Sequence, residues 1–477
     1  MITFLVSVIA LILGYLIYSK IIERIYGADP NRETPAIKLQ DGVDFVPMKW
    51  GKVFLIQFLN IAGLGPIFGA ILGAAYGPVA FIWIVVGCIF AGAVHDYFSG
   101  MLSLKHNGLS IPEVVGKYLG NGFKQFMRAF TVILMILVGA VFILGPADIL
   151  SGFKIGNLNF LTVTFWSSII IVYYLIATLL PIDKIIGRIY PFFGAVLLFM
   201  AVGIGLSMFF DGSIKDVPEL IPKNMVNMKH EASNYPIFPM LFITIACGAI
   251  SGFHSTQAPM MARCLNNEKM GRRVFYGAMI AEGLVALIWA AAAMCFFGTI
   301  DGLNDTLAER TPAYIVNEIA NSSLGKLGGI LAILGVVAAP ITSGDTSFRS
   351  ARLIIADFMK ISQKKISKRF LVSIPVFAIG LVITLVKFDV IWRYFGWSNQ
   401  TLATIVLWAI TVYLMINKKN FWVTLIPAAF MTSVVITYIL SVPQGFNLSQ
   451  NLSVILGGLV VVGTLIAFFV YKNKMKL

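Results

Sequence analysis

Ionisable side chains are rare inside the apolar stretches of this sequence, and the few that lie there are the first candidates for chemistry. His95 and Asp96 are adjacent near the end of one stretch, and Glu282 lies about ten residues into another. A charged group in hydrocarbon is costly, so such groups are usually tied to proton or ion movement. We therefore expect His95, Asp96 and Glu282 to couple movement of a solute to protons. The alternatives are a pairing of Asp96 with a loop arginine and a purely structural hydrogen bond at Glu282.

Two other stretches are interrupted by residues that weaken helices. One reads Asn60-Ile61-Ala62-Gly63-Leu64-Gly65-Pro66, and the other runs from Gly248 to Pro259 with a polar centre. Proline removes a backbone donor, and glycine costs helix stability. A broken membrane helix offers carbonyls to cations and half-helix N-termini to anions. We expect substrate to bind between the breaks, at Gly63, Gly65, Pro66, Ser251, Gly252, His254, Ser255, Thr256 and Gln257.

Purely structural roles for the same residues are the alternative. Glycines often do no more than allow membrane helices to pack closely, and hydroxyls often bond the preceding turn. His254 can hold a substrate carboxylate, relay protons, or be a buried histidine that is satisfied by its neighbours.

A third polar group reads Thr342-Ser343-Gly344-Asp345-Thr346. Hydroxyl and carboxylate oxygens are suitable ligands for a small hard cation. By analogy with LeuT-type transporters, in which such a Thr/Ser pair faces the break of the first helix, we expect Ala62, Thr342, Ser343 and Asp345 to bind a coupling cation such as sodium. The alternative is a polar helix end at which Asp345 bonds Arg349 or Arg352. A further amide pair, Asn399-Gln400, is expected to line an outer vestibule or to cap the helix that it begins.

Composition places all these residues in a membrane. Of the 477 residues, 58% are hydrophobic and only 12% are charged, and mean hydropathy is +0.87. A soluble chain cannot hide that much apolar surface. The net charge of +14 is explained by basic cytoplasmic loops, so no nucleic-acid partner is inferred. No nucleotide-binding loop or metal-ligand spacing occurs, and we expect no cofactor, no metal centre and no enzymatic activity.

Thirteen apolar stretches are long enough to cross a bilayer as helices. With the N-terminus outside, 28 of the 36 Lys and Arg residues fall on one side of the membrane and 8 on the other. This asymmetry predicts an outside N-terminus and an inside C-terminus in a bacterial-type cytoplasmic membrane. The predicted spans are about 2–19, 53–75, 79–103, 126–149, 162–180, 188–210, 238–257, 272–299, 327–347, 369–387, 394–416, 420–441 and 451–471.

The two interrupted spans are five crossings apart and therefore run in opposite directions. Five is odd, so a repeat of five spans must invert in the membrane, which is the arrangement of LeuT-type transporters. We predict an all-α polytopic protein in four parts: an extra helix and cytoplasmic loop (1–52), a first five-helix repeat (53–210), a second, inverted repeat (238–416), and two C-terminal helices with a basic tail (420–477).

Several stretches resemble the carbon starvation protein A family of membrane transporters. They are Asp41-Gly42-Val43-Asp44-Phe45, Gly92-Ala93-Val94-His95-Asp96, the run from Ser251 to Gln257, the run from Gly271 to Met279, and the run from Thr342 to Thr346. The family is grouped with the amino acid–polyamine–organocation superfamily, which implies the LeuT-type architecture. The resemblance also implies uptake of peptides, or of pyruvate in some members. The chain is shorter than the long family members, chiefly after 416.

These observations predict a secondary transporter that imports a small organic solute by alternating access. The solute is a peptide, pyruvate or a related carboxylate, and the coupling ion is H⁺ or Na⁺, with protons favoured. The partners are thus solute, ion and lipid bilayer, and the oligomeric state is left open. A passive channel, a solute-sensing receptor and an intramembrane enzyme are the alternatives. Inverted broken helices in one chain suit a rocking mechanism better than a pore.

Overall fold

The computed structural model describes residues 1–477 apart from 152–160, 180–185, 364 and 476–477. Within these residues the regular structure is helical, and an isolated parallel bridge joins Met48 to Leu265. The first half of the chain forms α1 (Ile2–Leu13), α2 (Ser19–Tyr26), α3 (Pro35–Lys38), α4 (Trp50–Ile61), α5 (Ala70–Ala74), α6 (Val79–Val86), α7 (Ala93–Lys105), α8 (Ile111–Leu119), α9 (Asn121–Ser151), α10 (Val163–Leu179) and α11 (Ile186–Phe210).

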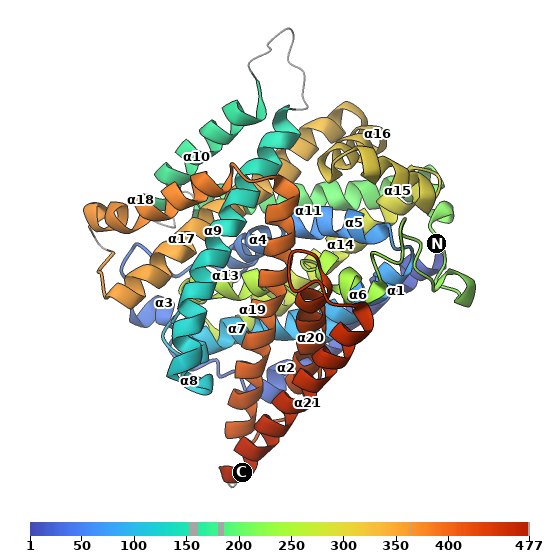
Figure 1. Ribbon diagram of the computed structural model, residues 1–477. Coiled ribbons are helices and arrows are strands. Elements are labelled where there is room, and N and C mark those ends of the chain that lie inside the picture. The colour runs from blue at the N-terminus through green and yellow to red at the C-terminus, as the bar shows by residue number, and fades with distance from the viewer. Residues whose placement is uncertain (152–160, 180–185, 364, 476–477) are drawn as a thin grey trace.

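The second half of the chain is also helical (Figure 1). It forms α12 (Phe242–Thr244), α13 (Gly252–Ala262), α14 (Gly277–Phe296), α15 (Ile300–Glu309), α16 (Pro312–Ala332), α17 (Ala338–Met359), α18 (Ile366–Ile383), α19 (Phe388–Ile416), α20 (Trp422–Ser441) and α21 (Gln450–Lys474). Wider, π-helical turns join or precede several helices, at Gly14–Tyr18, Gly65–Gly69, Gly87–Gly92, Ile237–Leu241, Arg272–Tyr276 and Ile333–Val337.

Nine helical stretches among the described residues are long and apolar enough to cross a membrane. The pair Trp50–Ile61 and Gly65–Ala74, bent by 55°, makes a tenth. The other three predicted spans coincide with the short helix α10, with the interrupted segment from Ile237 to Ala262, and with the junction of α16 and α17. The total of thirteen stays a prediction, while the all-helical membrane fold agrees with the sequence.

The first predicted break is present. α4 ends at Ile61 because Ala62 leaves helical geometry, with φ −81° and ψ 51°. The chain then turns through the π-helical Gly65–Gly69 segment, in which Pro66 cannot supply a backbone donor.

The second predicted break is longer. α12 ends at Thr244, and α13 begins only at Gly252. Gly248 has φ +91°, a left-handed conformation that side-chain-bearing residues rarely adopt. Ser251 is extended, with φ −144° and ψ 127°, and leads into α13.

The two breaks touch each other, and this contact is the centre of the fold. A Cβ atom added at Gly65 would lie 2.2 Å from the Cβ of Cys247, and one added at Gly69 would lie 2.9 Å from the carbonyl oxygen of Thr244. The glycines of the first break therefore let the backbone approach the second break within van der Waals contact.

Two helices extend beyond the limits expected from hydropathy. α17 continues to Met359 rather than ending near 347, and α19 begins at Phe388 rather than near 394. Asp345 and Asn399 consequently lie inside helices instead of at their ends. Buried polar side chains along both helices shift the apparent boundaries, because a hydropathy scan treats a buried polar residue as if it faced water.

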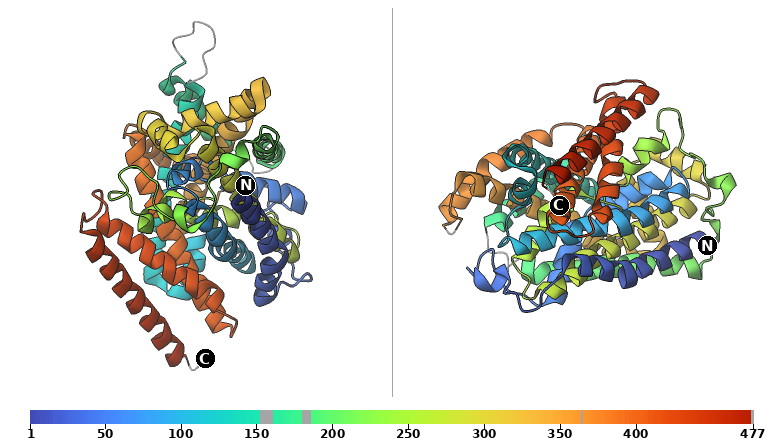
Figure 2. Two further views of the ribbon diagram at one scale, coloured as in Figure 1. Left: turned by 90° about the vertical axis from the view of Figure 1, so that its right-hand side faces the viewer. Right: turned by 90° about the horizontal axis from the view of Figure 1, so that it is seen from below.

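The additional helices lie at the periphery. α1 and α2 lie along one flank, and the α20–α21 pair lies along the opposite flank (Figure 2). α21 is largely exposed apolar surface, whereas α9 and the Val79–Lys105 segment are mostly buried. The helices that carry the candidate residues therefore form the protected interior.

The contact between the breaks predicts the effect of adding one methyl group. Gly65→Ala places a carbon against Cys247, and overpacking of this kind costs about 1–3 kcal/mol. We expect a lower midpoint of thermal unfolding for the detergent-purified protein. The matched control is Gly463→Ala in α21, where an added Cβ meets no atom within 4 Å. Equal unfolding midpoints for both variants would contradict the close packing of the breaks.

Candidate functional site

A chain of ionisable side chains joins three helices beside the second break. Nδ1 of His95 lies 2.8 Å from Oδ1 of Asp96, and Nδ1 of His254 lies 2.9 Å from Oδ2 of the same carboxylate. Nε2 of His254 lies 3.4 Å from Oε2 of Glu282. All four side chains are fully buried. The structure thus brings together the predicted coupling residues of α7 and α14 with His254 of α13, and neighbouring His95 and Asp96 contact each other directly.

The His254–Glu282 contact is the loosest link of this chain. With the Asp96 carboxylate accepting from both Nδ1 atoms, a further proton can reside on Nε2 of His254 or on Glu282. Within the described residues, Nε2 and both Glu282 oxygens make no hydrogen bond. A buried charge is costly without a close opposite charge. The free energy of the His254–Glu282 pair therefore depends on which of the two groups holds the proton.

The predicted cation group is divided between two helices. Oγ of Ser343 lies 3.2, 2.9 and 3.0 Å from the carbonyl oxygens of Leu59, Asn60 and Ala339. These carbonyls lie at the end of α4, just before Ala62. Oγ1 of Thr342 instead donates to Ala339 at 2.6 Å, within its own helix.

Asp345 faces a different helix from Ser343. Its Oδ2 accepts from the hydroxyl of Tyr190 in α11 at 2.6 Å. Ser343 therefore contacts the end of α4 at the first break, whereas Asp345 and Thr342 are directed elsewhere.

The predicted substrate-binding residues are all buried at the breaks. Asn399 of α19 occupies the N-terminus of α13: its Oδ1 accepts from the backbone N–H of Phe253 at 2.6 Å, and its Nδ2 lies 2.9 Å from Oγ of Ser251. The N-terminal donor that we expected to receive a substrate carboxylate is thus paired with a neighbouring helix in this conformation.

The hydroxyls that follow bond their own helix. Ser255 donates to the carbonyl of Gly252 at 2.7 Å, and Thr256 donates to that of Phe253 at 2.6 Å. Nε2 of Gln257 donates to Thr256 at 2.8 Å. Ser255 and Thr256 thereby follow the alternative in which hydroxyls satisfy the preceding turn.

One trio of side chains has the chemistry of a metal site. The ligand atoms of Cys247, His254 and Glu282 lie within 4.8 Å of one another and are buried. Thiolate, imidazole and carboxylate together are suitable for a divalent transition metal. No local spacing pattern marks this set, because Cys247 lies within the second break and Glu282 comes from α14.

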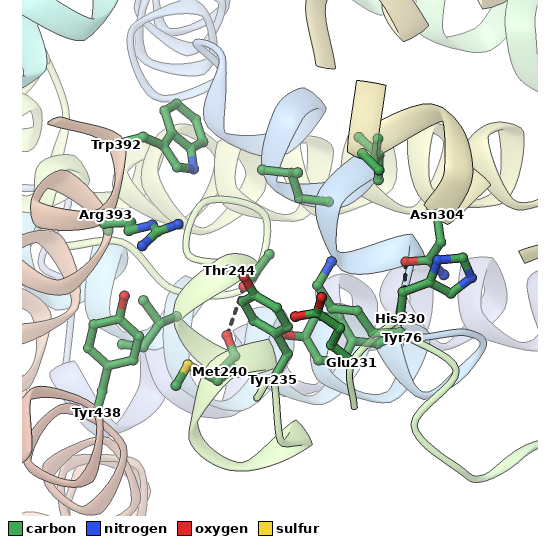
Figure 3. Close-up of a pocket in the computed structure, with 16 residues that line it drawn as sticks. Tyr76, His230, Glu231, Tyr235, Met240, Thr244, Asn304, Trp392, Arg393 and Tyr438 are labelled. Carbon is green, nitrogen blue, oxygen red and sulfur yellow. Dashed lines mark hydrogen bonds between the residues drawn. The ribbon is translucent and has the colours of Figure 1, made fainter. Parts of the chain in front are cut away.

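Among the cavities on the side that carries α15, which the basic-residue count predicts to be outside, two lie next to the first broken helix. One, of about 490 Å³, is lined by residues of α5, α15, α19 and the 229–244 region (Figure 3). The other, of about 660 Å³, reaches Phe68, which follows the first break. Both share Leu72 and Trp392. A path thus leads from this side towards the joint of the two breaks.

Aromatic rings separate the cavities from the buried site. Ring centroids of Phe68 and Trp392 are 6.0 Å apart, and those of Trp392 and Phe395 are 5.4 Å apart. Phe142 continues the row, with its ring 6.3 Å from Phe395 and 6.0 Å from Phe253. The row thus runs from Trp392, which lines both cavities, to Phe253, which precedes His254.

On the opposite side, the loop that carries Asp41–Phe45 packs against α17 and against the residues that follow α13. Asp44 lies 3.9 Å from Nη1 of the buried Arg349. The Met48 N–H donates to the carbonyl of Cys264 at 2.9 Å, and the Arg263 guanidinium lies 5.1 Å from the ring centre of Phe45. The loop is therefore fastened to both α17 and the end of α13.

The structure assigns roles at the site to four residues for which the sequence did not predict them: Asn399, Cys247, Tyr190 and Asp44. For Asn399, hydropathy predicts a position near the start of a helix, whereas it lies inside α19 and contacts α13. Cys247 stands next to the glycine of the second break, and a search for ligand types beside a break is the signal that would have found it. Tyr190 and Asp44 meet partners more than 150 residues away in the chain, which no local pattern reveals.

The model of the carbon starvation protein CstA family matches residues 1–158, 147–317 and 301–438. The chain belongs to this family. A Haemophilus influenzae "uncharacterized membrane protein" is 46% identical, covering 65% of this chain and 94% of its own. The Escherichia coli "peptide transporter CstA" is 25% identical, covering 89% and 78% respectively. The E. coli "pyruvate/proton symporter BtsT" is 28% identical, covering 60% and 48%.

Solved structures support the architecture. MhsT in complex with L-phenylalanine superposes with a TM-score of 0.58 at 12% identity, covering 87% of this chain and 98% of that one. A manganese transporter from Eremococcus coleocola gives 0.53 at 14% identity, covering 91% and 98%. These likenesses confirm the LeuT-type fold. With the family, they make the chain a multi-pass membrane transporter, as the sequence resemblance implied.

Replacing Asn399 tests its role at the second break. Asn399→Ala leaves the Phe253 N–H and Ser251 without their partner inside the protein, which costs about 1–3 kcal/mol. We expect a lower unfolding midpoint in detergent. Asn451→Ala, at an exposed position of α21, is the control and should match the parent protein. An unchanged midpoint for Asn399→Ala would show that this amide does not hold α13 in place.

Proposed function

We propose that this protein imports a small organic solute, a peptide, pyruvate or a related carboxylate, in symport with protons. The observation that carries the proposal is the buried His254, which lies between Asp96 and Glu282 at the joint of two broken helices. Family membership and the named relatives make the chain a transporter. Its coupling to protons and its solute class are what we propose. The name of the E. coli pyruvate/proton relative is consistent with it.

The coupling step follows from the one variable proton. A proton shared by His254 and Glu282 makes the pair an imidazolium facing a carboxylate, so that each buried charge has an opposite charge beside it. Loss of the proton leaves Glu282 charged beside a neutral ring, close to the Asp96 carboxylate. We propose that α7 moves with the first repeat and that α13 and α14 move with the second, so the proton state biases which arrangement is stable.

The conformation described here supports an outward-facing stage of alternating access. Cavities lie on the predicted outer side, and the Asp44 loop closes the predicted inner side. In the proposed cycle, solute passes the aromatic row, displaces Asn399 from the N-terminus of α13, and releases the Asp44–Arg349 contact. The N-terminus outside and the C-terminus inside remain the proposed orientation.

Sodium is the alternative coupling ion, and the Ser343 group supports it. Three carbonyl oxygens converge on one hydroxyl there, and oxygen ligands of this kind suit Na⁺. Under sodium coupling, Ser343→Ala removes the dependence of uptake on a sodium gradient. Under proton coupling, the same variant retains its response to a pH gradient.

A transition metal as cargo is the second candidate function, favoured by the Cys247, His254 and Glu282 trio. Purified protein in liposomes would then take up Zn²⁺ or Mn²⁺, and Cys247→Ala would weaken this uptake. Uptake of organic solute with no metal flux excludes it.

Replacing Glu282 tests the proton coupling directly. Glu282→Gln holds one protonation state, so we expect uphill accumulation of solute in liposomes under a pH gradient to be lost while exchange of internal for external solute continues. Glu318→Gln, at an exposed position of α16, is the matched control and should accumulate normally. Normal accumulation by Glu282→Gln would remove this residue from the mechanism.

His106 lies outside the predicted membrane spans and provides a control for the pH dependence of solute uptake. Burial, together with the charges of Lys117 and Lys105, lowers the pKa of His106 to about 4. His106 therefore stays neutral from pH 5 to 8, and His106→Gln should leave the pH dependence of uptake unchanged, whereas His254→Gln should abolish it.

The inner closure predicts the reactivity of a buried thiol. Burial raises the pKa of the Cys264 thiol to about 12, so it reacts slowly with maleimides. Asp44→Ala loosens the loop that bonds Cys264, and we expect faster labelling of Cys264 by N-ethylmaleimide, measured by mass spectrometry. Asp301→Ala, on the α15 side, should label like the parent protein. Equal rates for all three would contradict a closing role of the Asp44 loop.

A further inference from the structure

The cavity of about 490 Å³ carries opposite charges on opposite walls. Figure 3 shows Arg393 on one side with its guanidinium directed inwards and Glu231 on the other side, with aromatic side chains between them. The volume lies within the range of small-molecule sites, about 300–1,000 Å³. Its walls are polar as well as aromatic, which distinguishes it from a gap between lipid-facing helices.

The cationic wall is available to an anion. Arg393 comes from α19, next to Trp392 of the aromatic row, and makes no ion pair with any described residue. The hydroxyl of Tyr438 lies beside it (Figure 3). A guanidinium with a neighbouring phenol is suited to a carboxylate, since it offers several donors in one plane.

The second cation of the cavity is already held by rings. Nζ of Lys229 lies 5.4 Å from the ring centre of Tyr76 and 5.2 Å from that of Tyr235. Such contacts stabilise an ammonium in a half-buried place. Lys229 therefore occupies the faces of both rings, and the Glu231 carboxylate is the anionic group of this wall.

The wall that carries Glu231 is fixed to the helices. Nδ2 of Asn304 in α15 donates to the carbonyls of Met228 and Ala75, at 3.1 and 3.2 Å. The Met228 N–H reaches the carbonyl of Tyr76 at 3.4 Å. The segment that precedes Glu231 is thereby tied to the end of the first broken helix, so movement of that helix changes the cavity.

We propose that this cavity is a first binding site for zwitterionic solutes, taking the carboxylate at Arg393 and the ammonium group at Glu231. Amino acids and short peptides have both groups, and pyruvate has only one. The inference rests on the proposed function for the direction of entry, and it narrows the solute class to molecules with a free amine. From here the solute faces Trp392 and the aromatic row that leads to the breaks.

The test compares ligands that lack one charge at a time. Dialanine, N-acetyl-dialanine and dialanine amide are measured for binding to the full-length detergent-purified protein and for uptake into liposomes. We expect Arg393→Gln to weaken dialanine and N-acetyl-dialanine roughly three- to tenfold while leaving dialanine amide unchanged. Glu231→Gln should weaken dialanine and the amide but not the N-acetyl form. These factors are those of partly exposed charge contacts.

Two controls isolate the cavity. Lys223→Gln and Glu318→Gln remove the same charges at exposed positions that do not line this cavity. Both should bind all three ligands like the parent protein. In uptake, the cavity variants should raise KM and leave the maximal rate unchanged, because the site precedes the coupling step.

The outcomes separate this proposal from the proposed function. Ligand-selective binding changes without any gradient-driven uptake uphold the cavity site and overturn symport. Gradient-driven uptake that is indifferent to both cavity variants overturns the site and upholds symport. Equal loss of all three ligands in either variant, or tighter binding of pyruvate than of dialanine, overturns the two-point recognition.

Discussion

The structure depends on an acid–base pair enclosed at the joint of two broken helices. Asp96 is bonded by two imidazoles, and His254 faces Glu282 on its other side. Groups so deeply buried cannot rely on solvent to balance their charge, so they must balance one another. One proton decides whether that balance holds. The three helices involved, α7, α13 and α14, belong to different predicted repeats, and any rearrangement between the repeats changes the environment of that proton. We regard this as the physical origin of the proposed coupling.

The backbone geometry of the two breaks encloses the His254–Glu282 pair. Gly65 and Gly69 let the first break touch the second, and Gly248 adopts a conformation that other residues avoid. Breaking the helices brings Leu59 and Asn60 carbonyls to Ser343 and the N-terminus of α13 to Asn399. Both helix ends are thus satisfied by side chains of neighbouring helices rather than left empty. A solute that replaces Asn399 or a cation that joins Ser343 would exchange one set of partners for another, which is a modest energetic change and suits a reversible carrier.

Much of this arrangement could be predicted from residue types and order. Glycine, proline and polar residues inside apolar runs located both breaks, and the odd spacing between them predicted the inverted architecture. Deep ionisable residues identified the members of the buried network. What escaped prediction depends on three-dimensional packing: α17 and α19 extend past their hydropathic limits because their polar residues face protein, Asn399 serves a helix far away in sequence, and Ser255 and Thr256 bond their own turns instead of facing open space. The cavities lie towards the predicted outer side, and the breaks are in contact with each other. Which conformation a transporter populates depends on packing, so it could not be predicted from the sequence.

The most direct measurement of the central claim is the proton flux that accompanies solute entry. Purified protein in weakly buffered liposomes, with no imposed gradient, is mixed with dialanine while external pH is recorded. The account predicts that the medium becomes more alkaline as solute enters, in a fixed ratio to solute taken up, and that a protonophore abolishes this pH change without stopping downhill uptake. Solute entry with no change in external pH, whether or not sodium is present, would contradict proton coupling through the buried pair.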